Sequence, residues 1–182
     1  MILNKHKIFQ LISILCIISF SYSYSIERKI GDVLQIALPV TAITTTYYMD
    51  DINGTKSFFK SYLATASTTY LLKITTRRLR PDGSNYMSFP SGHTSAAFSG
   101  ASFIHFRYGF KYSVPLYLLA SYTGYSRIYA EKHYLGDVIA GASLAIFSSW
   151  YFTPKYTKDY TFNLYYNPIN KTIGVNIYKF SF

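Results

Sequence analysis

Cysteine and acidic residues are both scarce in this sequence of 182 residues. A single cysteine, Cys16, excludes an internal disulfide framework and a metal site built from several cysteines. Asp and Glu total 8 against 18 Lys and Arg, a formal net charge of +10, which favours an anionic partner. The basic residues form no long tail in the sequence, and their densest cluster, at 73–80, favours a local anion site over binding of nucleic acid.

Long apolar runs are lacking as well. The longest uninterrupted runs are shorter than the ~20 residues of a simple membrane span, and they are rich in Ser, Thr and Tyr. Yet the chain is 49% hydrophobic and 19% aromatic, which is too apolar for a disordered protein. A chain of this length fits one domain. We therefore expect one compact domain that touches a membrane, in preference to a protein with several membrane spans.

Residues 1–25 have the three-part layout of an export leader. Lys5 and Lys7 precede an apolar stretch from Ile8 to Phe20, and small and polar residues follow at 21–25. This order predicts a secretory signal peptide, with an uncleaved N-terminal membrane anchor as the alternative. In either case the chain is expected to be exported or attached to a membrane.

Residues 26–155 are expected to form one all-α domain. Apolar and small residues at helical spacing predict five helices, within 30–48, within 57–72, from Ser91 onward, within 114–125 and within 138–152. Five helices make a helical bundle the expected architecture.

The tail, residues 156–182, changes to an alternating pattern. Polar and apolar residues alternate from Tyr160 to Tyr165 and again from Ile173 to Phe180, around a turn candidate at 167–171. This period predicts a short C-terminal β-hairpin. Two interpretations stay open: a hairpin that covers the bundle or pairs with a partner, and a membrane contact through the aromatic end at Phe182.

Two short stretches carry residues suited to binding a phosphoryl group. Lys73 and Arg80 are seven residues apart, so on a continuous helix both would project from one face toward a common anion. In Pro90-Ser91-Gly92-His93-Thr94, Ser91 can cap a helix whose free N–H groups can hold a phosphate, with His93 on the first turn beside it. Taken singly, a basic helix end and a lone histidine are more often structural.

A third stretch runs from Ser126 to Asp137. His133 and Asp137 are four residues apart, so on a helix the carboxylate could accept a hydrogen bond from one ring nitrogen and leave the other free to attack. Arg127 offers a further donor to phosphate oxygens. Taken alone, the His133 and Asp137 pair could equally form a surface hydrogen bond.

Together the three stretches resemble, in order, the signature of the type 2 phosphatidic acid phosphatase family. The match reads Lys, six residues, Arg-Pro; then Pro-Ser-Gly-His; then Ser-Arg, five residues, His, three residues, Asp, and it covers residues 73–137. Bacterial class A acid phosphatases and vanadium haloperoxidases share this signature. The resemblance implies the helical fold of that family.

The resemblance also implies a role for each signature residue. His133 would attack phosphorus and form a phosphohistidine, Asp137 would orient it, and His93 would protonate the departing group and later activate water. The phosphoryl oxygens would be bound by Lys73, Arg80, Ser91, Gly92 and Arg127. No metal or other cofactor is implied, because the cationic side chains stabilise the transition-state charge. Four charged residues outside the signature are expected to lie on the surface or to contact a substrate headgroup: Arg77, Arg78, Glu131 and Lys132.

We therefore expect a metal-independent phosphatase that hydrolyses a lipid phosphate monoester or pyrophosphate at the periplasmic face of a bacterial cell envelope. A periplasmic acid phosphatase for soluble phosphomonoesters is the close alternative. A vanadate haloperoxidase is disfavoured by the short, apolar chain. A non-catalytic envelope protein with a relic site is disfavoured by the intact signature.

Overall fold

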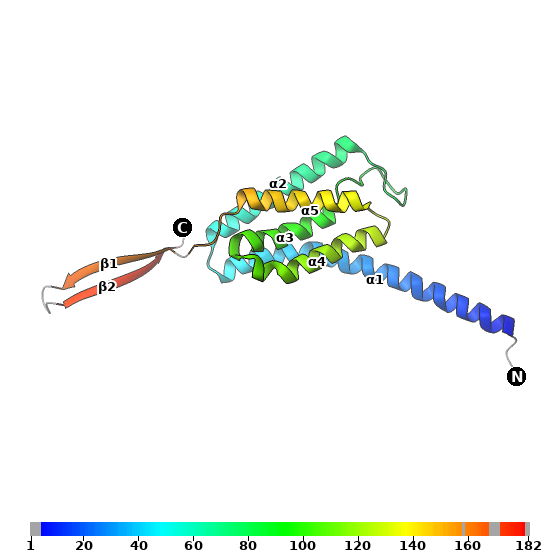
Figure 1. The fold of residues 1–182 in the computed structure, drawn as a ribbon, viewed down its shortest axis with the longest axis horizontal. Coiled ribbons are helices and arrows are strands. Elements are labelled where there is room, and N and C mark those ends of the chain that lie inside the picture. Colours follow the sequence, from blue (N-terminus) through cyan, green and yellow to red (C-terminus); the bar gives the residue numbers. More distant parts are fainter. Residues whose placement is uncertain (1–4, 158, 168–171, 181–182) are drawn as a thin grey trace.

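A computed structural model describes residues 5–157, 159–167 and 172–180, with the side chains of 26–157 and of Tyr165, Tyr166 and Ile173. Within these residues the chain forms five helices and a two-stranded hairpin (Figure 1). In chain order the elements are α1 (Lys5–Tyr48), α2 (Ile52–Thr76), α3 (Gly92–Tyr108), α4 (Phe110–Tyr129), α5 (Leu135–Phe152), β1 (Asp159–Asn167) and β2 (Thr172–Phe180). The predicted all-α bundle with a short C-terminal hairpin is confirmed.

Helix α1 is far longer than the predicted segment at 30–48. It continues through 44 residues without ending at Pro39, and its N-terminal half projects beyond the other helices (Figure 1). The expected leader at 1–25 lies in this helix from Lys5 onward, while residues 1–4 lie outside the described residues. Its removal as a signal peptide stays a prediction.

Helix α3 is the centre of the bundle and packs against α1, α2, α4 and α5. Small residues permit this, because at Gly100 a Cβ atom would collide with the backbone of Leu38 and Pro39 in α1. Two small apolar clusters lie around α3. They consist of Leu38, Ala97, Ala101 and Ala120, and of Ala42, Phe58, Phe103 and Ile104.

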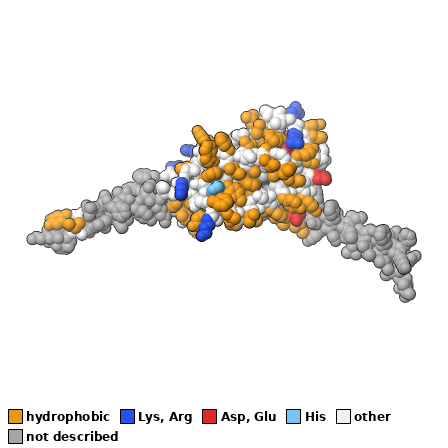
Figure 2. Space-filling model, in the orientation of Figure 1, with side chains coloured by type: hydrophobic (Ala, Val, Ile, Leu, Met, Phe, Trp, Pro, Cys, Tyr) orange, Lys and Arg blue, Asp and Glu red, His pale blue; other side chains and the backbone are white. Residues whose placement is uncertain are grey.

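The bundle places small polar residues inside and many large apolar residues outside. Buried hydroxyl groups donate within their own helices, as from Thr65 to the Ser61 carbonyl oxygen at 2.9 Å and from Ser99 to that of Ser95 at 2.8 Å. Exposed apolar side chains occur on four helices and include Val33, Ile36, Val40, Phe59, Leu63, Leu118, Phe147 and Trp150. Figure 2 shows apolar side chains over much of the visible face of the bundle. Close packing through small residues is typical of helices that associate in lipid.

Among the described residues, α5 (Leu135–Phe152) is the one helix whose length and composition would suit a membrane crossing. Its mean hydropathy over those 18 residues is 1.3, and 28% of the window is buried in the bundle.

Strands β1 and β2 pair antiparallel, from Asp159 opposite Phe180 to Asn167 opposite Thr172. Within the described residues the strands contact each other and none of the helices, and the hairpin extends away from the bundle (Figure 1). The hairpin therefore does not cover the bundle. Most of the predicted turn, residues 168–171, and Phe182 lie outside the described residues.

Candidate active site

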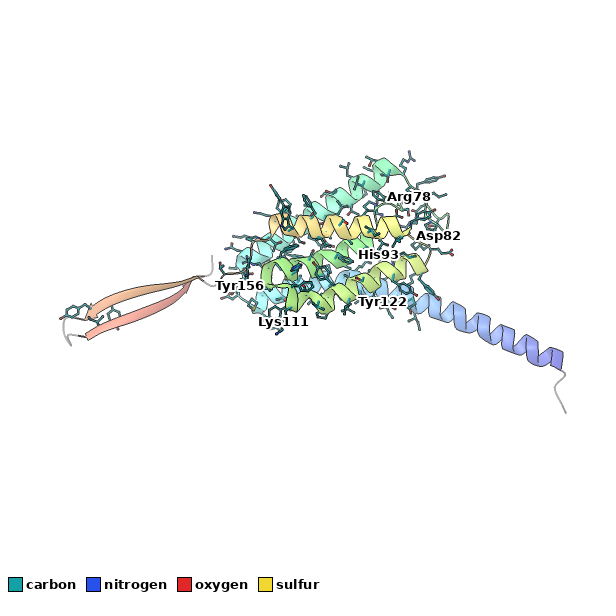
Figure 3. The ribbon with its side chains drawn as sticks, in the orientation of Figure 1. Arg78, Asp82, His93, Lys111, Tyr122 and Tyr156 are labelled. Carbon is teal, nitrogen blue, oxygen red and sulfur yellow. The ribbon has the colours of Figure 1, made fainter. Side chains whose placement is uncertain are left out.

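The three sequence stretches meet at one end of the bundle, where α2 and α4 end and α3 and α5 begin. Arg78 and Asp82 mark this end in Figure 3, with His93 nearer to them than to Lys111 and Tyr156, which lie toward the opposite end. We call these the site end and the hairpin end. Helix α1 leaves the bundle at the site end (Figure 1).

Lys73 lies in the last turn of α2 and anchors the loop that follows. Its Nζ donates to the carbonyl oxygens of Met87, at 2.8 Å, and of Pro90, at 2.5 Å. Burial lowers the pKa of Lys73 to about 8, and the nearby charge of Arg80 adds to the effect. An ammonium group has three N–H donors, so one is left for an anion.

Arg80 does not share a helix face with Lys73, so that sequence prediction is wrong. Helix α2 ends at Thr76 because Arg77 adopts the left-handed conformation (φ 47°) and its N–H bonds back to the Lys73 carbonyl oxygen. The loop nevertheless brings Arg80 close enough to influence Lys73 electrostatically. The buried Arg80 Nε has no hydrogen-bond partner among the described residues. Because an unpaired buried donor is unfavourable, a bound anion would stabilise it.

Helix α3 begins where the sequence predicts, with Ser91 as the N-cap. The Ser91 hydroxyl accepts hydrogen bonds from the Thr94 hydroxyl, at 2.9 Å, and the Thr94 N–H. Gly92 and His93 follow in the first turn, where backbone N–H groups have no carbonyl partner within the helix. A Cβ at Gly92 would lie 3.7 Å from Lys73 Cε, so this glycine stands beside the α2 cation.

His133 lies in the loop before α5 and is 3% exposed. Its Nδ1 is 2.7 Å from the carbonyl oxygen of Ser88. A carbonyl can only accept, so Nδ1 carries the hydrogen and Nε2 keeps its lone pair. Burial lowers the pKa of His133 to about 3, and the charges of Lys73 and Arg80 act in the same direction. The site therefore contains a neutral imidazole with one nitrogen available as a nucleophile.

Asp137 supports His133 differently from the prediction. The two do not share a helix, because α5 begins at Leu135 with Tyr134 as its N-cap, and Asp137 Oδ2 lies 3.8 Å from His133 Nδ1. The buried carboxylate instead accepts from the Ser88 hydroxyl at 2.5 Å, Arg78 Nη1 at 2.8 Å and the Tyr134 N–H at 2.9 Å. Asp137 thus holds the two loops that position the imidazole.

Arg127, near the end of α4, is 2% exposed and is bound on three sides. Its Nη1 donates to Asp32 Oδ1 at 2.7 Å, Nη2 to the Arg28 carbonyl oxygen at 2.5 Å, and Nε to the Ser126 hydroxyl at 3.1 Å. The same Asp32 oxygen lies 2.9 Å from His93 Nε2. Sequence reasoning missed Asp32, although it is a single acidic residue at the start of the apolar stretch 30–48.

The charged residues outside the signature divide between surface and site. Arg78 bonds to Asp137 and lies 4.2 Å from the ring centre of Tyr134, so it belongs to the support of the site. Lys132 pairs with Asp82, and Arg77 is the cap of α2. Within the described residues no group of three or more His, Cys, Asp or Glu side chains has a metal-binding arrangement.

The fold and the site define a class of protein. An all-α bundle carries, at one end, a neutral imidazole next to Lys73 and Arg80, a helix N-terminus and a second histidine beside Arg127. Such a site suits transfer of a phosphoryl group to a nucleophile. The sequence resemblance named a family with these features.

A model of the PAP2 superfamily matches residues 55–160, and the chain belongs to this superfamily. The chain is 36% identical over 137 residues to a lipid A 1-phosphatase of Porphyromonas gingivalis, covering 70% of this chain and 31% of that protein. It is 32% identical over 142 residues to a lipid A 4'-phosphatase of Helicobacter pylori, covering 72% of this chain and 71% of that protein.

The fold is similar to the crystal structure of LpxE from Aquifex aeolicus, with a TM-score of 0.60 and 21% identity over 70% of this chain and 83% of that chain. This match shows the fold, whereas the superfamily model and the Helicobacter pylori relative confirm the expected family; the relatives' names agree with the expected enzyme class.

Proposed function

We propose that this chain is a phosphatase that hydrolyses a phosphate monoester on a lipid of the lipid A class at a bacterial cell envelope. The reaction proceeds through a phosphohistidine and without a metal ion. The observation that carries this proposal is the neutral His133 imidazole, whose Nδ1 is held by Ser88, whose Nε2 has no hydrogen-bond partner among the described residues, and whose pKa the cations Lys73 and Arg80 help to lower. The names of the two bacterial relatives support the substrate class.

The first chemical step forms the phosphohistidine. His133 Nε2 attacks phosphorus, the bond from phosphorus to the ester oxygen breaks, and the protonated His93 gives its proton to that oxygen, which leaves as an alcohol. Lys73, Arg80 and Arg127 face the charge that develops on the phosphoryl oxygens. Asp137 keeps Ser88 and the His133 loop in place throughout.

The second step hydrolyses the intermediate. His93, now neutral, accepts a proton from a water molecule, whose oxygen attacks phosphorus as the bond to His133 Nε2 breaks. Inorganic phosphate leaves, and His133 and His93 return to their starting states. Three fixed cations supply the charge stabilisation that magnesium supplies in other phosphoryl-transfer enzymes.

An apolar groove next to the anion site supports a lipid substrate over a soluble ester. A cavity of about 210 Å³ is lined by Lys73 and Gly92 at one end and by Tyr62 and Ala96 farther along α2 and α3. Tyr62 and Ala96 also line a second cavity, of about 410 Å³, which extends to α1. A hydrocarbon chain bound there would keep its phosphate at the cations. The exposed apolar faces of the helices (Figure 2) support a place in or against the membrane.

The test compares matched substrates with and without acyl chains. We would measure phosphate release by purified protein in detergent micelles with EDTA, from lipid A carrying both phosphates and from the deacylated disaccharide, and identify the products by mass. We expect release from lipid A at a kcat/KM at least about 100-fold above that of the deacylated form, because each acyl CH₂ group that leaves water for the micelle and the apolar groove contributes about 0.8 kcal/mol and so brings the substrate to the enzyme. Equal rates would favour the soluble-ester alternative, and dependence on added metal would contradict the proposed mechanism.

A further inference from the structure

Asp32 belongs to none of the three signature stretches and lies outside residues 55–160, which the superfamily model matches. It is nevertheless in contact with two signature residues, at 2.7 Å from Arg127 Nη1 and 2.9 Å from His93 Nε2. Its side chain is 42% exposed, whereas that of Arg127 is 3% exposed. The carboxylate therefore stands at the open side of the site, between the two groups.

The neighbouring residue shows that α1 is fitted to this place. Gly31 is buried, and a Cβ atom there would collide with the Ser126 hydroxyl and Arg127 Nη2. Helix α1 also supplies the Arg28 carbonyl oxygen to Arg127. The close approach that glycine permits thus brings Asp32 within bonding distance of both signature side chains.

The contact with Asp32 determines which nitrogen of His93 is available. An ionised carboxylate only accepts, so His93 Nε2 must carry a hydrogen, and the exchangeable proton of the imidazolium is then on Nδ1. His93 Nδ1 has no hydrogen-bond partner among the described residues. The His93 ring is thus held through Nε2 and keeps Nδ1 unpaired, whereas the His133 ring is held through Nδ1 by Ser88 and keeps Nε2 unpaired.

We propose that Asp32 is a positioning residue of the reaction: it fixes the ring and tautomer of His93, so that Nδ1 gives its proton to the leaving alcohol and afterwards accepts one from water. This inference rests on the phosphatase function proposed above and adds a residue to it. In the first step the Nδ1 proton goes to the ester oxygen as the phosphorus–oxygen bond breaks. In the second step Nδ1 recovers a proton from water, so Asp32 stays ionised and the proton count balances.

Charged groups reach His93 from three directions. Burial lowers its pKa and the charge of Arg127 on α4 lowers it further; Asp32 on α1 opposes both, and Arg80 in the loop after α2 adds a smaller lowering. Asp32 is the acidic group in this set, so its removal moves the pKa of His93 downward. Less of the acid form would then exist at neutral pH.

The test uses the different need of two leaving groups for a proton. An alkyl phosphate and a nitrophenyl phosphate with the same hydrocarbon chain would be compared in one kind of micelle, with wild type and Asp32→Asn. We expect kcat/KM for the alkyl ester to fall about 30- to 100-fold, part of the 10²- to 10⁴-fold that a general acid supplies, and kcat/KM for the nitrophenyl ester to fall less than about 5-fold. The nitrophenolate leaves without a proton, and kcat/KM reports the first step.

Glu27→Gln is the matched control, because Glu27 is an acidic residue that precedes Asp32 on α1 and accepts a hydrogen bond from the Tyr122 hydroxyl. It should leave the ratio of the two esters unchanged, and Asp32→Glu should restore part of the alkyl activity. Equal losses on both esters in Asp32→Asn would overturn the proposal and reduce Asp32 to a structural partner of Arg127. A gain on both esters would show that Asp32 instead competes with phosphate.

A second readout does not require turnover. In protein labelled at histidine, the His93 ring signals, assigned with His93→Gln, should titrate at lower pH in Asp32→Asn than in wild type or Glu27→Gln. An unchanged titration overturns the role of Asp32 even if the enzyme is active. A shifted titration in a protein that releases no phosphate would support the Asp32 contact and contradict the phosphatase function, so the two failures are distinguishable.

Discussion

Both ends of the bundle contain arginine and aspartate side chains, but the hydrogen-bond partners of these side chains differ between the two ends. At the hairpin end, buried Arg107 binds the buried Asp51 carboxylate through Nε at 2.7 Å and Nη2 at 2.5 Å. Arg107 Nη1 donates to the Pro154 carbonyl oxygen, and Tyr108 donates its hydroxyl to Asp51 at 2.8 Å. Burial raises the pKa of Asp51, but the hydrogen bonds from Arg107, Gly54 and Tyr108 outweigh it and leave the pKa below its usual value. This end is a closed ion pair.

At the site end one buried donor is left without a partner. Arg80 Nε has no hydrogen-bond partner in the described part of the chain, and the charges of Lys73 and Arg80 both lower the pKa of His133, which the Asp137 carboxylate opposes. The difference between a structural ion pair and a binding site is therefore not the presence of arginine and aspartate. It is whether the protein itself satisfies the cations or leaves donors for a ligand.

The test with the largest expected effect replaces one histidine at each end. His133→Ala should lower kcat by at least about 10³-fold, because it removes the nucleophile. His105→Ala, at the hairpin end, should keep kcat, since His105 contacts Tyr117 at 3.1 Å and the ring of Phe106 and no signature residue among those described. Phosphate release per folded protein is the measurement, and circular dichroism checks the fold. A large loss in both variants would contradict the assignment of the site to one end.

The second test breaks the ion pair of Asp51 and Arg107 at the hairpin end. Asp51→Ala leaves the Arg107 charge buried without its partner and removes the N-cap of α2, so we expect a loss of about 3–5 kcal/mol in the free energy of unfolding. Activity per folded molecule should stay near that of wild type. Denaturant unfolding in detergent gives the stability, and kcat below the unfolding range gives the function. A variant with normal stability and low kcat would show that the hairpin end belongs to the site.

For the site end, the sequence indicated the identity of the residues better than their arrangement in space. The order of the signature residues named Lys73, Arg80, His93, Arg127 and His133, and the structure brings the stretches that carry them to one end of the bundle. That order was not enough to place Arg80 in a loop, since nothing in the spacing reveals that Arg77 is left-handed and ends α2. The His133 to Asp137 spacing likewise suggested one helix, whereas α5 begins between them, at Leu135, with Tyr134 as its N-cap.

Contacts between distant segments were beyond the sequence. Asp32 reaches Arg127 across 95 positions of the chain, and Asp51 reaches Arg107 across 56. Neither pair has a local pattern. Gly31 and Gly100 are the points where α1 closely approaches α4 and α3, and nothing in the local sequence identified them as such.

A third test uses pH to examine the site end through His133. The pKa of folded His133 is about 3 against 6.5 ordinarily, so between these values the unfolded chain binds a proton that the folded chain does not. Stability from the neutral ring is therefore full above pH 6.5 and is lost as the pH falls. We expect the difference in Tm between wild type and His133→Asn to shrink from pH 7 to pH 4. A constant difference would mean that His133 is not held neutral.

The smallest effect is expected at the ion pair of Arg78 and Asp137. Here the site end contains an arginine–aspartate pair, as the hairpin end does. The side chain of Arg78 is 44% exposed, whereas that of Arg107 is 7% exposed, so solvent screens the Arg78 pair. Arg78→Ala should cost less than about 1 kcal/mol of stability. Asp137 keeps Ser88 and the Tyr134 N–H, so kcat should fall only about 3- to 10-fold through a looser His133. Arg77→Asn, which keeps a residue tolerant of the left-handed conformation, is the neighbouring control and should change neither quantity. A loss in Arg78→Ala as large as that of His133→Ala would place Arg78 among the groups that touch the phosphate.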